Sequence, residues 1–301
     1  MIQASATLER ATDTPAAQAH PREDCFMHSV RGELVEPHNP STGSGRTDSF
    51  SATQVPLPPR VRLKAEGLSI AFGRQQVLRG VNLDLTGGQI ALLRGPNGCG
   101  KTTLLNVLSG FLKPDAGTAS LQFNGTRVDI LNETPDRLAR LGLARLWQDI
   151  RLFPTMTVLE NVLAASPHAI GINPVRALFA LGKVKKQERE FRAQALAWLD
   201  MLGMADRADS SGDKLSVGQS KRVAIARMLQ TGSKVLLLDE PLAGLDNDSA
   251  AKLVEDLNRL ADATHRAMLI VEHNHEAITP VCDIRYTLNE GVMMREELEG
   301  K

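Results

Sequence analysis

The segment GPNGCGKT, residues 95–102, has the composition of a loop that binds phosphate groups. It fits the pattern G-x-x-x-x-G-K-[ST], and it lies between an apolar run and a stretch with apolar residues at helical spacing. Glycines let backbone N–H groups turn toward phosphate oxygens, the helix N-terminus adds partial positive charge, lysine supplies a point charge, and the threonine hydroxyl can ligate Mg²⁺. The predicted phosphate-binding residues are Gly95, Pro96, Asn97, Gly98, Cys99, Gly100, Lys101, Thr102 and Thr103.

Two acids end a second apolar run, VLLLDE, at residues 235–240. In open α/β sheets ligands bind at the carboxyl ends of strands. Asp239 is expected to hold Mg²⁺, directly or through water, and Glu240 is expected to orient the attacking water and accept its proton. An acid at a strand end can also simply be solvated, but the phosphate loop in the same chain favours the functional interpretation.

Three single residues could complete such a site. Gln148 follows the run LARLW and could reach Mg²⁺ or the attacking water. His273 follows AMLIVE and could contact the γ-phosphate, and Phe72 could stack on adenine. A lone histidine after a strand is more often structural and a lone phenylalanine is more often core, so neither is decisive alone.

A second segment, DKLSVGQSKR at residues 213–222, reads as a polar turn followed by a helix start. Ser216, Gly218 and Gln219 could hold an anion at that helix N-terminus. The alternative is that Ser216 is a plain helix cap. Its distance in sequence from the phosphate loop raises the question of why one chain carries two such devices.

The apolar pattern predicts alternating strands and helices. Strands are expected at VNLDL, IALLR, TASLQF, KVLLLDE and AMLIVEH, with a hairpin at the NG that follows TASLQF. Helices are expected at KTTLLNVLSGFL with Leu104, Leu105, Leu108 and Phe111 on one face, after a capping box at Thr157 and Glu160, and over 186–202 and 249–261. This alternation predicts a largely parallel sheet with both faces covered.

The composition of the chain argues against several classes of protein. Lys+Arg and Asp+Glu are both 35, so the net charge of zero gives no support for a general nucleic-acid coat. Cys25, Cys99 and Cys282 fit neither a disulfide framework nor a metal site, which favours a reducing cytoplasm. No apolar run approaches the ~20 residues of a membrane span, so a membrane role must come through a partner.

Residues 1–60 are expected to be a disordered tail. They are rich in proline and poor in bulky apolar residues, and such a segment cannot bury enough surface to offset its ordering entropy. We hypothesise that the working protein begins near Val55 to Val61; the alternative is a genuine flexible tail.

Taken together, the motifs of about 61–291 resemble the ABC ATPases, the ATP-binding subunits of ABC transporters. The order is complete: phosphate loop, Gln148, signature LSVGQ at 215–219, acidic strand at 235–240, D-loop around 244–246, and His273. The resemblance implies a P-loop NTPase (RecA-like) α/β core with an antiparallel β subdomain. It also implies one ATPase domain over 61–301, with an inserted α-helical subdomain at 149–221.

The resemblance also implies how the chain works. ATP and Mg²⁺ are the expected cofactors, with Thr102, Gln148 and Asp239 as metal ligands, and Glu240, His273 and Gln148 as catalytic residues. Two such subunits, identical or related, would pack head to tail, so that the signature of one chain closes over ATP held by the other. The second anion-binding device would therefore serve the partner's nucleotide.

The partners implied are membrane permease subunits and, indirectly, a periplasmic or extracellular substrate-binding protein, with no nucleic acid. The chain would lie at the cytoplasmic face of the inner or plasma membrane through the permease. Part of the segment after Gln148 is expected to form an apolar docking site for a short permease helix, the alternative being that it packs inside the helical subdomain. The residues are Ile150, Leu152, Phe153 and Met156.

Within the family, RLWQDIRLFPTMTVLENVLAA and VEHNHE look like the ATPases of branched-chain amino acid importers and of the similar urea and short-amide importers. Val217 and Ser220 depart from that style, in which an aromatic residue and a glutamine are more typical. An exporter or lipopolysaccharide-extraction ATPase is one alternative, and a non-transport ABC protein acting on DNA or ribosomes is another.

Overall fold

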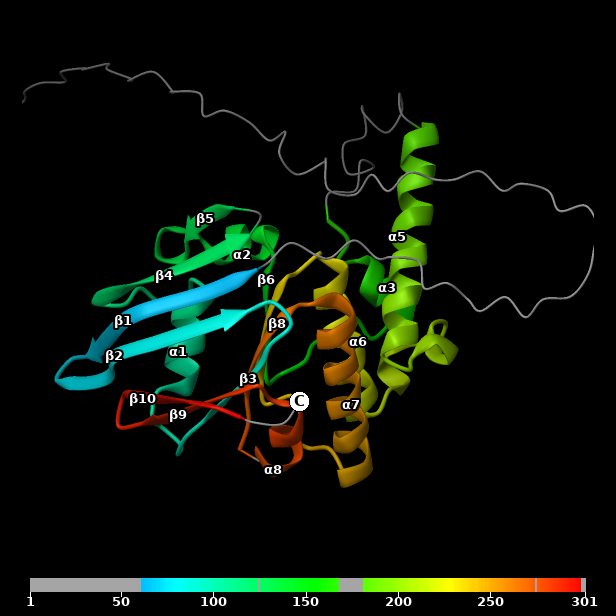
Figure 1. Ribbon diagram of the computed structural model, residues 1–301. Coiled ribbons are helices and arrows are strands. Elements are labelled where there is room, and N and C mark those ends of the chain that lie inside the picture. The colour runs from blue at the N-terminus through cyan, green and yellow to red at the C-terminus, as the bar shows by residue number, and fades with distance from the viewer. Residues whose placement is uncertain (1–60, 124, 168–180, 274, 299–301) are drawn as a thin grey trace, which may run out of the picture. The chain divides into compact units, whose positions relative to one another are not determined.

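The computed structural model describes residues 61–123, 125–167, 181–273 and 275–298 (Figure 1). Its strands are β1 (Arg62–Phe72), β2 (Gln75–Thr86), β3 (Ile90–Arg94), β4 (Ala116–Phe123), β5 (Thr126–Asp129), β6 (Leu143–Leu146), β7 (Val235–Asp239), β8 (Ala267–Val271), β9 (Ile284–Asn289) and β10 (Val292–Glu297). Its α-helices are α1 (Lys101–Leu108), α2 (Pro135–Leu141), α3 (Val158–Leu163), α5 (Leu181–Met201), α6 (Val217–Gln230), α7 (Asn247–Thr264) and α8 (His275–Ile278). The predicted tail, residues 1–60, lies outside the described residues.

Six strands form the central sheet in the order β10-β9-β3-β8-β7-β6. β9, β3, β8, β7 and β6 run parallel, and β10 pairs antiparallel with β9. Every residue of β7 and β8 is buried, as is every residue of β3 except Arg94. These strands are continuous apolar runs because the sheet is covered on both faces, as the sequence predicted.

The two faces of this sheet bury two separate cores. Ile90 and Leu92 of β3 pack with the apolar sides of α3, α5, α6 and α7. Ala91 and Leu93 point the other way, into a core shared with α1 and the second sheet. Successive side chains of a strand alternate between faces, so one short strand contributes to both cores. Figure 1 shows the result, with α6 and α7 on one side of the central strands and β1, β2 and β4 on the other.

The second sheet is antiparallel, in the order β2-β1-β4-β5. Its alternating strand at residues 81–85 points Val81, Leu83 and Leu85 into the core, as the period-two pattern predicted. The hairpin expected after TASLQF is confirmed, since β4 and β5 pair antiparallel with Phe123 opposite Thr126.

Two helices begin where the sequence predicted, α1 at the phosphate loop and α3 after its capping box, whereas the helix predicted over 186–202 begins earlier, since α5 spans Leu181–Met201. The capping box at α3 is confirmed: Glu160 N–H donates to Thr157 Oγ1 at 3.1 Å, and Thr157 N–H donates to Glu160 Oε2 at 2.8 Å. The predicted extension of α1 to Phe111 is wrong. α1 ends at Leu108, Gly110 adopts a left-handed φ of 77°, and the Phe111 side chain is 52% exposed.

Between residues 149 and 221, the described part of the chain contains α3, α5 and the short 3₁₀ turns Ala205–Arg207 and Gly212–Lys214, and it ends in the first turns of α6. Its assignment as a separate helical subdomain stays a prediction. Among the helices that the structure describes, none has both the length and the apolar character to cross a bilayer.

Candidate functional site

Four adjacent parallel strands bring distant parts of the sequence to one edge of the central sheet. β3, β8, β7 and β6 are neighbours, and the carboxyl ends of parallel strands lie at the same edge. The phosphate loop follows β3, His273 follows β8, and Gln148 follows β6. Asp239 ends β7 and Glu240 comes directly after it. Most of the residues proposed from sequence therefore converge on this edge.

The phosphate loop folds around its own lysine. Lys101 is buried, and its Nζ donates to Gly95 O at 2.8 Å and to Pro96 O at 3.0 Å. Gly100 caps α1 with a left-handed φ of 110°, and no side chain caps that helix N-terminus. The first-turn N–H groups of α1 thus have no competing side-chain acceptor, which is the condition for binding an anion there.

Two glycines of the loop are required for different reasons. Gly98 has a left-handed φ of 76°, and a Cβ placed there would meet no atom within 4 Å. Gly100 also has a left-handed φ of 110°, and a Cβ placed there would lie 3.0 Å from Val77 O, a tighter contact than most side chains make. Cys99 is buried in the core shared with α1, which leaves its backbone as the part that can serve the loop.

Glu240 is held by the two residues expected to act with it. Its Oε2 accepts a hydrogen bond from Gln148 Nε2 at 3.0 Å, and its Oε1 lies 3.2 Å from His273 Nε2. Its backbone has a left-handed φ of 51°, which is uncommon outside glycine and costs about 1–3 kcal/mol where it is maintained. Lys221 of α6 donates from Nζ to the Glu240 carbonyl at 3.1 Å and to Ala243 O at 2.6 Å, which fixes this turn.

Asp239 has a partner that sequence reasoning missed. Arg145 of β6 donates from Nη2 to Asp239 Oδ2 at 2.8 Å, and both side chains are largely buried. The available signal was a charged residue inside LARL, a short strand otherwise made of apolar residues. The residues lie 94 positions apart, so the pairing required knowledge of the strand order.

The donor set fits Mg²⁺ better than a softer metal. Thr102, Gln148 and Asp239 supply hydroxyl, carboxamide and carboxylate oxygens, the ligands of hard cations. Among the residues that the structure describes, no three His, Cys, Asp or Glu side chains gather into a metal cluster. A cation here would need further oxygens from phosphates and water, which is how Mg²⁺ is commonly held.

Ser216 and Phe72 lie at the surface of this chain. Ser216 caps α6 in a capping box with Gln219: Gln219 N–H donates to Ser216 Oγ at 3.3 Å and Ser216 N–H donates to Gln219 Oε1 at 3.0 Å. Gly218 is buried beside Leu245. Within the described part of the chain no hydrogen bond joins this signature to the phosphate loop. Phe72, at the end of β1, is 51% exposed.

Glu272 is a third acid at this edge, beside Asp239 and Glu240, and sequence reasoning did not single it out. Burial raises the pKa of its carboxyl to about 7, against the opposing effects of the Leu242 N–H bond and the Lys221 ammonium. Burial also lowers the pKa of Lys221, although Glu272 and Glu240 act against that shift. The site therefore contains a carboxyl group that changes charge near neutral pH.

Glu272→Gln is expected to remove one contribution to the pH dependence of stability. The pKa is about 7 in the folded chain and near its ordinary 4.5 in the unfolded chain, so the folded state binds more protons between these values. The contribution of the Glu272 carboxyl to the free energy of unfolding of the wild type therefore falls as the pH rises from 4.5 to about 7. Glutamine keeps an acceptor for Leu242 N–H without the charge.

The difference in free energy of unfolding, variant minus wild type, should grow from pH 4.5 to 7 and level off above. Urea unfolding at pH 5, 6, 7 and 8 measures it, with the exposed Glu255→Gln as control. A difference that stays constant over this pH range would contradict the assignment.

The chain matches known proteins over most of its described length. A family model described as ABC transporter matches residues 78–243. The chain is 34% identical over 230 residues to the high-affinity branched-chain amino acid transport ATP-binding protein LivG of Escherichia coli (strain K12), covering 76% of this chain and 88% of that one. It is 32% identical over 234 residues to BraF, described in the same terms, of Pseudomonas aeruginosa, covering 78% and 90%.

Solved structures agree with the fold. A nucleotide-free ATP-binding cassette from an ABC transporter superposes with a TM-score of 0.65 at 32% identity, covering 79% of this chain and 92% of that one. The ADP conformation of MJ1267, an ATP-binding cassette of an ABC transporter, gives 0.65 at 33% identity with the same coverage. The predictions of family and fold class are confirmed: this chain belongs to the ABC transporter family.

Proposed function

We propose that this chain is the ATP-hydrolysing subunit that powers a membrane importer for branched-chain amino acids or a related small amide. The observation that carries the proposal is the convergence of the phosphate loop, Asp239, Glu240, Gln148 and His273 on one sheet edge. The substrate class rests on the similarity to LivG and BraF, proteins named for branched-chain amino acid transport.

Hydrolysis follows from the groups at that edge. The phosphate loop and the α1 N-terminus hold the phosphates of ATP, while the exposed Phe72 ring stacks on adenine. Glu240 orients a water and accepts its proton as the water oxygen bonds the γ-phosphorus. The bond from that phosphorus to the β–γ bridging oxygen breaks, giving ADP and phosphate. Gln148 and His273 hold the Glu240 carboxylate in place.

Thr102, Asp239 and Gln148 would hold Mg²⁺, which when bound neutralises charge on the phosphate oxygens. Arg145 keeps the Asp239 carboxylate fixed in the chain itself. The oxygen donors thus come from α1, β7 and the segment after β6, three elements whose relative positions are set by the sheet and its cover.

The signature serves the nucleotide of a second subunit. Ser216 is exposed and caps the N-terminus of α6. Within the described residues it makes no hydrogen bond to the phosphate loop of its own chain. In a head-to-tail pair, the Ser216 hydroxyl and the N–H groups around Gly218 grip the γ-phosphate bound by the other chain. Hydrolysis removes that phosphate and releases the pair, which couples chemistry to opening and closing.

The subunit acts at the cytoplasmic face of the membrane through permease subunits that receive substrate from a binding protein. The proposed docking surface lies in the helical subdomain of residues 149–221. Phe153 and Met156 are 46% and 37% exposed, whereas Ile150 and Leu152 are half-buried against the core. Ile150 also lines an open cleft of about 660 Å³. A short permease helix is the proposed occupant, and the similarity to LivG and BraF favours an import role over export or non-transport roles.

Glu240→Gln is expected to keep ATP binding, to lower the rate of hydrolysis about 10²-fold or more, and to accumulate as an ATP-bound dimer, since the proton acceptor is lost but the phosphate contacts remain. Phosphate release and sedimentation velocity with ATP measure these effects. Lys101→Ala is the control that should lose tight nucleotide binding. Wild-type turnover by Glu240→Gln would show that another group accepts the proton.

Ser216→Arg should leave ATP binding by the separate chain unchanged and prevent dimer formation, because a long cation would occupy an exposed site that faces the partner. Equilibrium binding of a fluorescent ATP analogue and sedimentation in the Glu240→Gln background separate the two effects. Ser216→Thr, which retains a capping hydroxyl, is the matched control. Dimerisation of the arginine variant at wild-type strength would refute the role of the signature.

Phe153→Asp should abolish co-purification with the permease without unfolding the chain, since the ring is 46% exposed. Detergent extraction followed by affinity capture measures the association, and circular dichroism checks the fold. Met294→Asp, an exposed position on β10, is the control for adding a surface charge. A folded Phe153→Asp subunit that still captures its permease would reject this docking surface.

A further inference from the structure

Arg145 is a buried cation that joins the phosphate-loop helix to the acidic strand. Its side chain is 3% exposed. From Nη2 it donates to Asp239 Oδ2 at 2.8 Å, and from Nη1 it donates to Asn106 Oδ1 at 2.6 Å, with Ser109 Oγ at 3.4 Å. Asn106 lies on α1 and Ser109 caps its end, so one guanidinium of β6 connects α1 to β7, two of the three elements that hold the proposed metal ligands.

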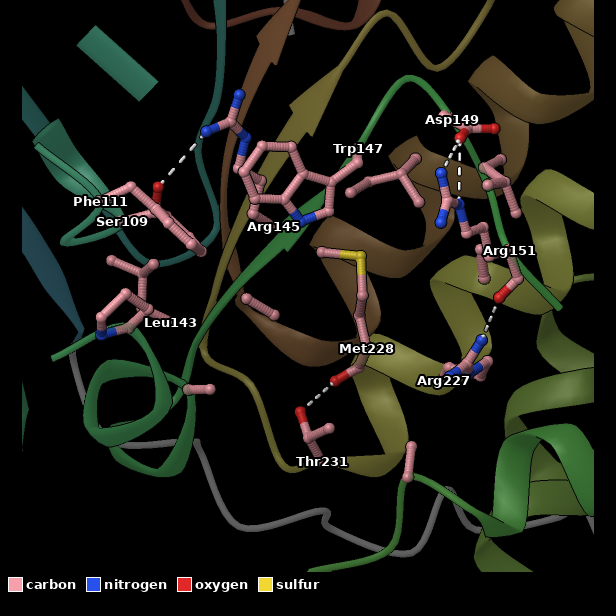
Figure 2. A pocket seen from close by; sticks show the side chains of 17 residues that line it. Ser109, Phe111, Leu143, Arg145, Trp147, Asp149, Arg151, Arg227, Met228 and Thr231 are labelled. Carbon is pink, nitrogen blue, oxygen red and sulfur yellow. Dashed lines mark hydrogen bonds and ion pairs between the residues drawn. The ribbon is translucent and has the colours of Figure 1, made fainter. Parts of the chain in front are cut away.

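The face of the same guanidinium packs on Trp147. The Arg145 Cζ lies 3.9 Å from the centre of the Trp147 ring, and that ring meets Phe111 edge to face at 5.2 Å. Both aromatic side chains are exposed, at 44% and 52%, and both line the cleft of about 660 Å³. Figure 2 shows Arg145 beside Trp147 at the cleft wall, with Met228 and Arg227 on its far side.

The position of the guanidinium depends on both contacts. A buried charge needs its partner, and a cation over the face of an aromatic ring is attracted by the negative charge of that face. The Arg145 Nε is buried and has no hydrogen-bond partner among the described residues, so the aromatic face and the two Nη groups set the orientation. A change at either Trp147 or Asp239 therefore alters the geometry offered to the other.

We propose that Arg145 is a positioning residue that couples the cleft wall at Trp147 to the carboxylate of Asp239. The inference rests on the proposed function, in which Asp239 is an Mg²⁺ ligand. A divalent cation and the guanidinium compete for the same carboxylate, so cation binding loosens the Arg145–Asp239 pair and shifts the guanidinium against Trp147. Coupling is reciprocal, so the state of Trp147 changes the affinity for the cation.

Trp147 emission tests the coupling from the metal side. The chain has two tryptophans, so Trp198→Phe leaves Trp147 as the single reporter. This protein is saturated with ATP in EDTA and then titrated with Mg²⁺. Emission should change with Mg²⁺ and saturate, Arg145→Met should abolish the change, and Arg227→Met, on the same cleft, should keep it. A Mg²⁺-dependent change of equal size in Arg145→Met, or none in the parent, overturns the proposal.

Trp147→Leu tests the coupling from the cleft side and does not depend on the folding of an Arg145 variant. Without the aromatic face the guanidinium is held less firmly and competes less well with Mg²⁺ for the Asp239 carboxylate. The Mg²⁺ concentration that gives half-saturation should therefore fall about fivefold. Fluorescence of bound N-methylanthraniloyl-ATP at varied Mg²⁺ measures it. Phe123→Leu is the matched control, because Phe123 forms an aromatic–cation pair with Lys234 instead of Arg145.

The outcomes separate this inference from the proposed function. A wild-type chain in which the fluorescence of the bound ATP analogue does not respond to Mg²⁺ would contradict the metal role of Asp239 and with it both proposals. Wild-type and Trp147→Leu proteins with the same Mg²⁺ half-saturation would overturn the role of Arg145 alone and leave the ATPase assignment standing.

Discussion

The parallel backbone ladder of β3, β8, β7 and β6 is the constraint on which the rest of the structure depends. Its registers set Leu93 opposite Val271 and Val271 opposite Asp239, so the strand ends lie level and the segments that leave them meet. Parallel strands must be buried on both faces, and the two cores on either side supply that burial. The residues of the candidate site lie at this edge because the loops there can carry polar groups while the strands that precede them stay apolar.

Charge at the edge is distributed among paired groups. Asp239 has Arg145, and the Glu240 carboxylate meets Gln148 and His273 while its carbonyl is bonded by Lys221. Lys221 belongs to α6, whose first turn is the signature, so the same helix touches the turn at Glu240 and presents Ser216 to the surface. This continuity gives a physical route by which a partner at the signature can influence the Glu240 carboxylate, the proposed proton acceptor.

Much of this could be predicted from local sequence. Short runs of residues are enough to predict three features: the phosphate loop, the buried strand before Asp239 and the cap at Ser216. The order of the strands cannot be predicted in this way, and the Arg145–Asp239 pair follows only from that order. Phe111 shows another limit: apolar spacing favoured a longer helix, but the left-handed Gly110 ends it and leaves the ring at the surface. Burial of Glu272 likewise depends on tertiary packing.

The central claim is that one chain carries an incomplete site that a second chain completes. The most direct test is the specific rate of phosphate release from ATP and Mg²⁺ by the purified chain, measured over a wide range of protein concentration. The account predicts that the rate per chain rises with protein concentration and levels off as dimers form. A rate per chain that stays constant down to concentrations at which the protein sediments as a monomer would contradict it.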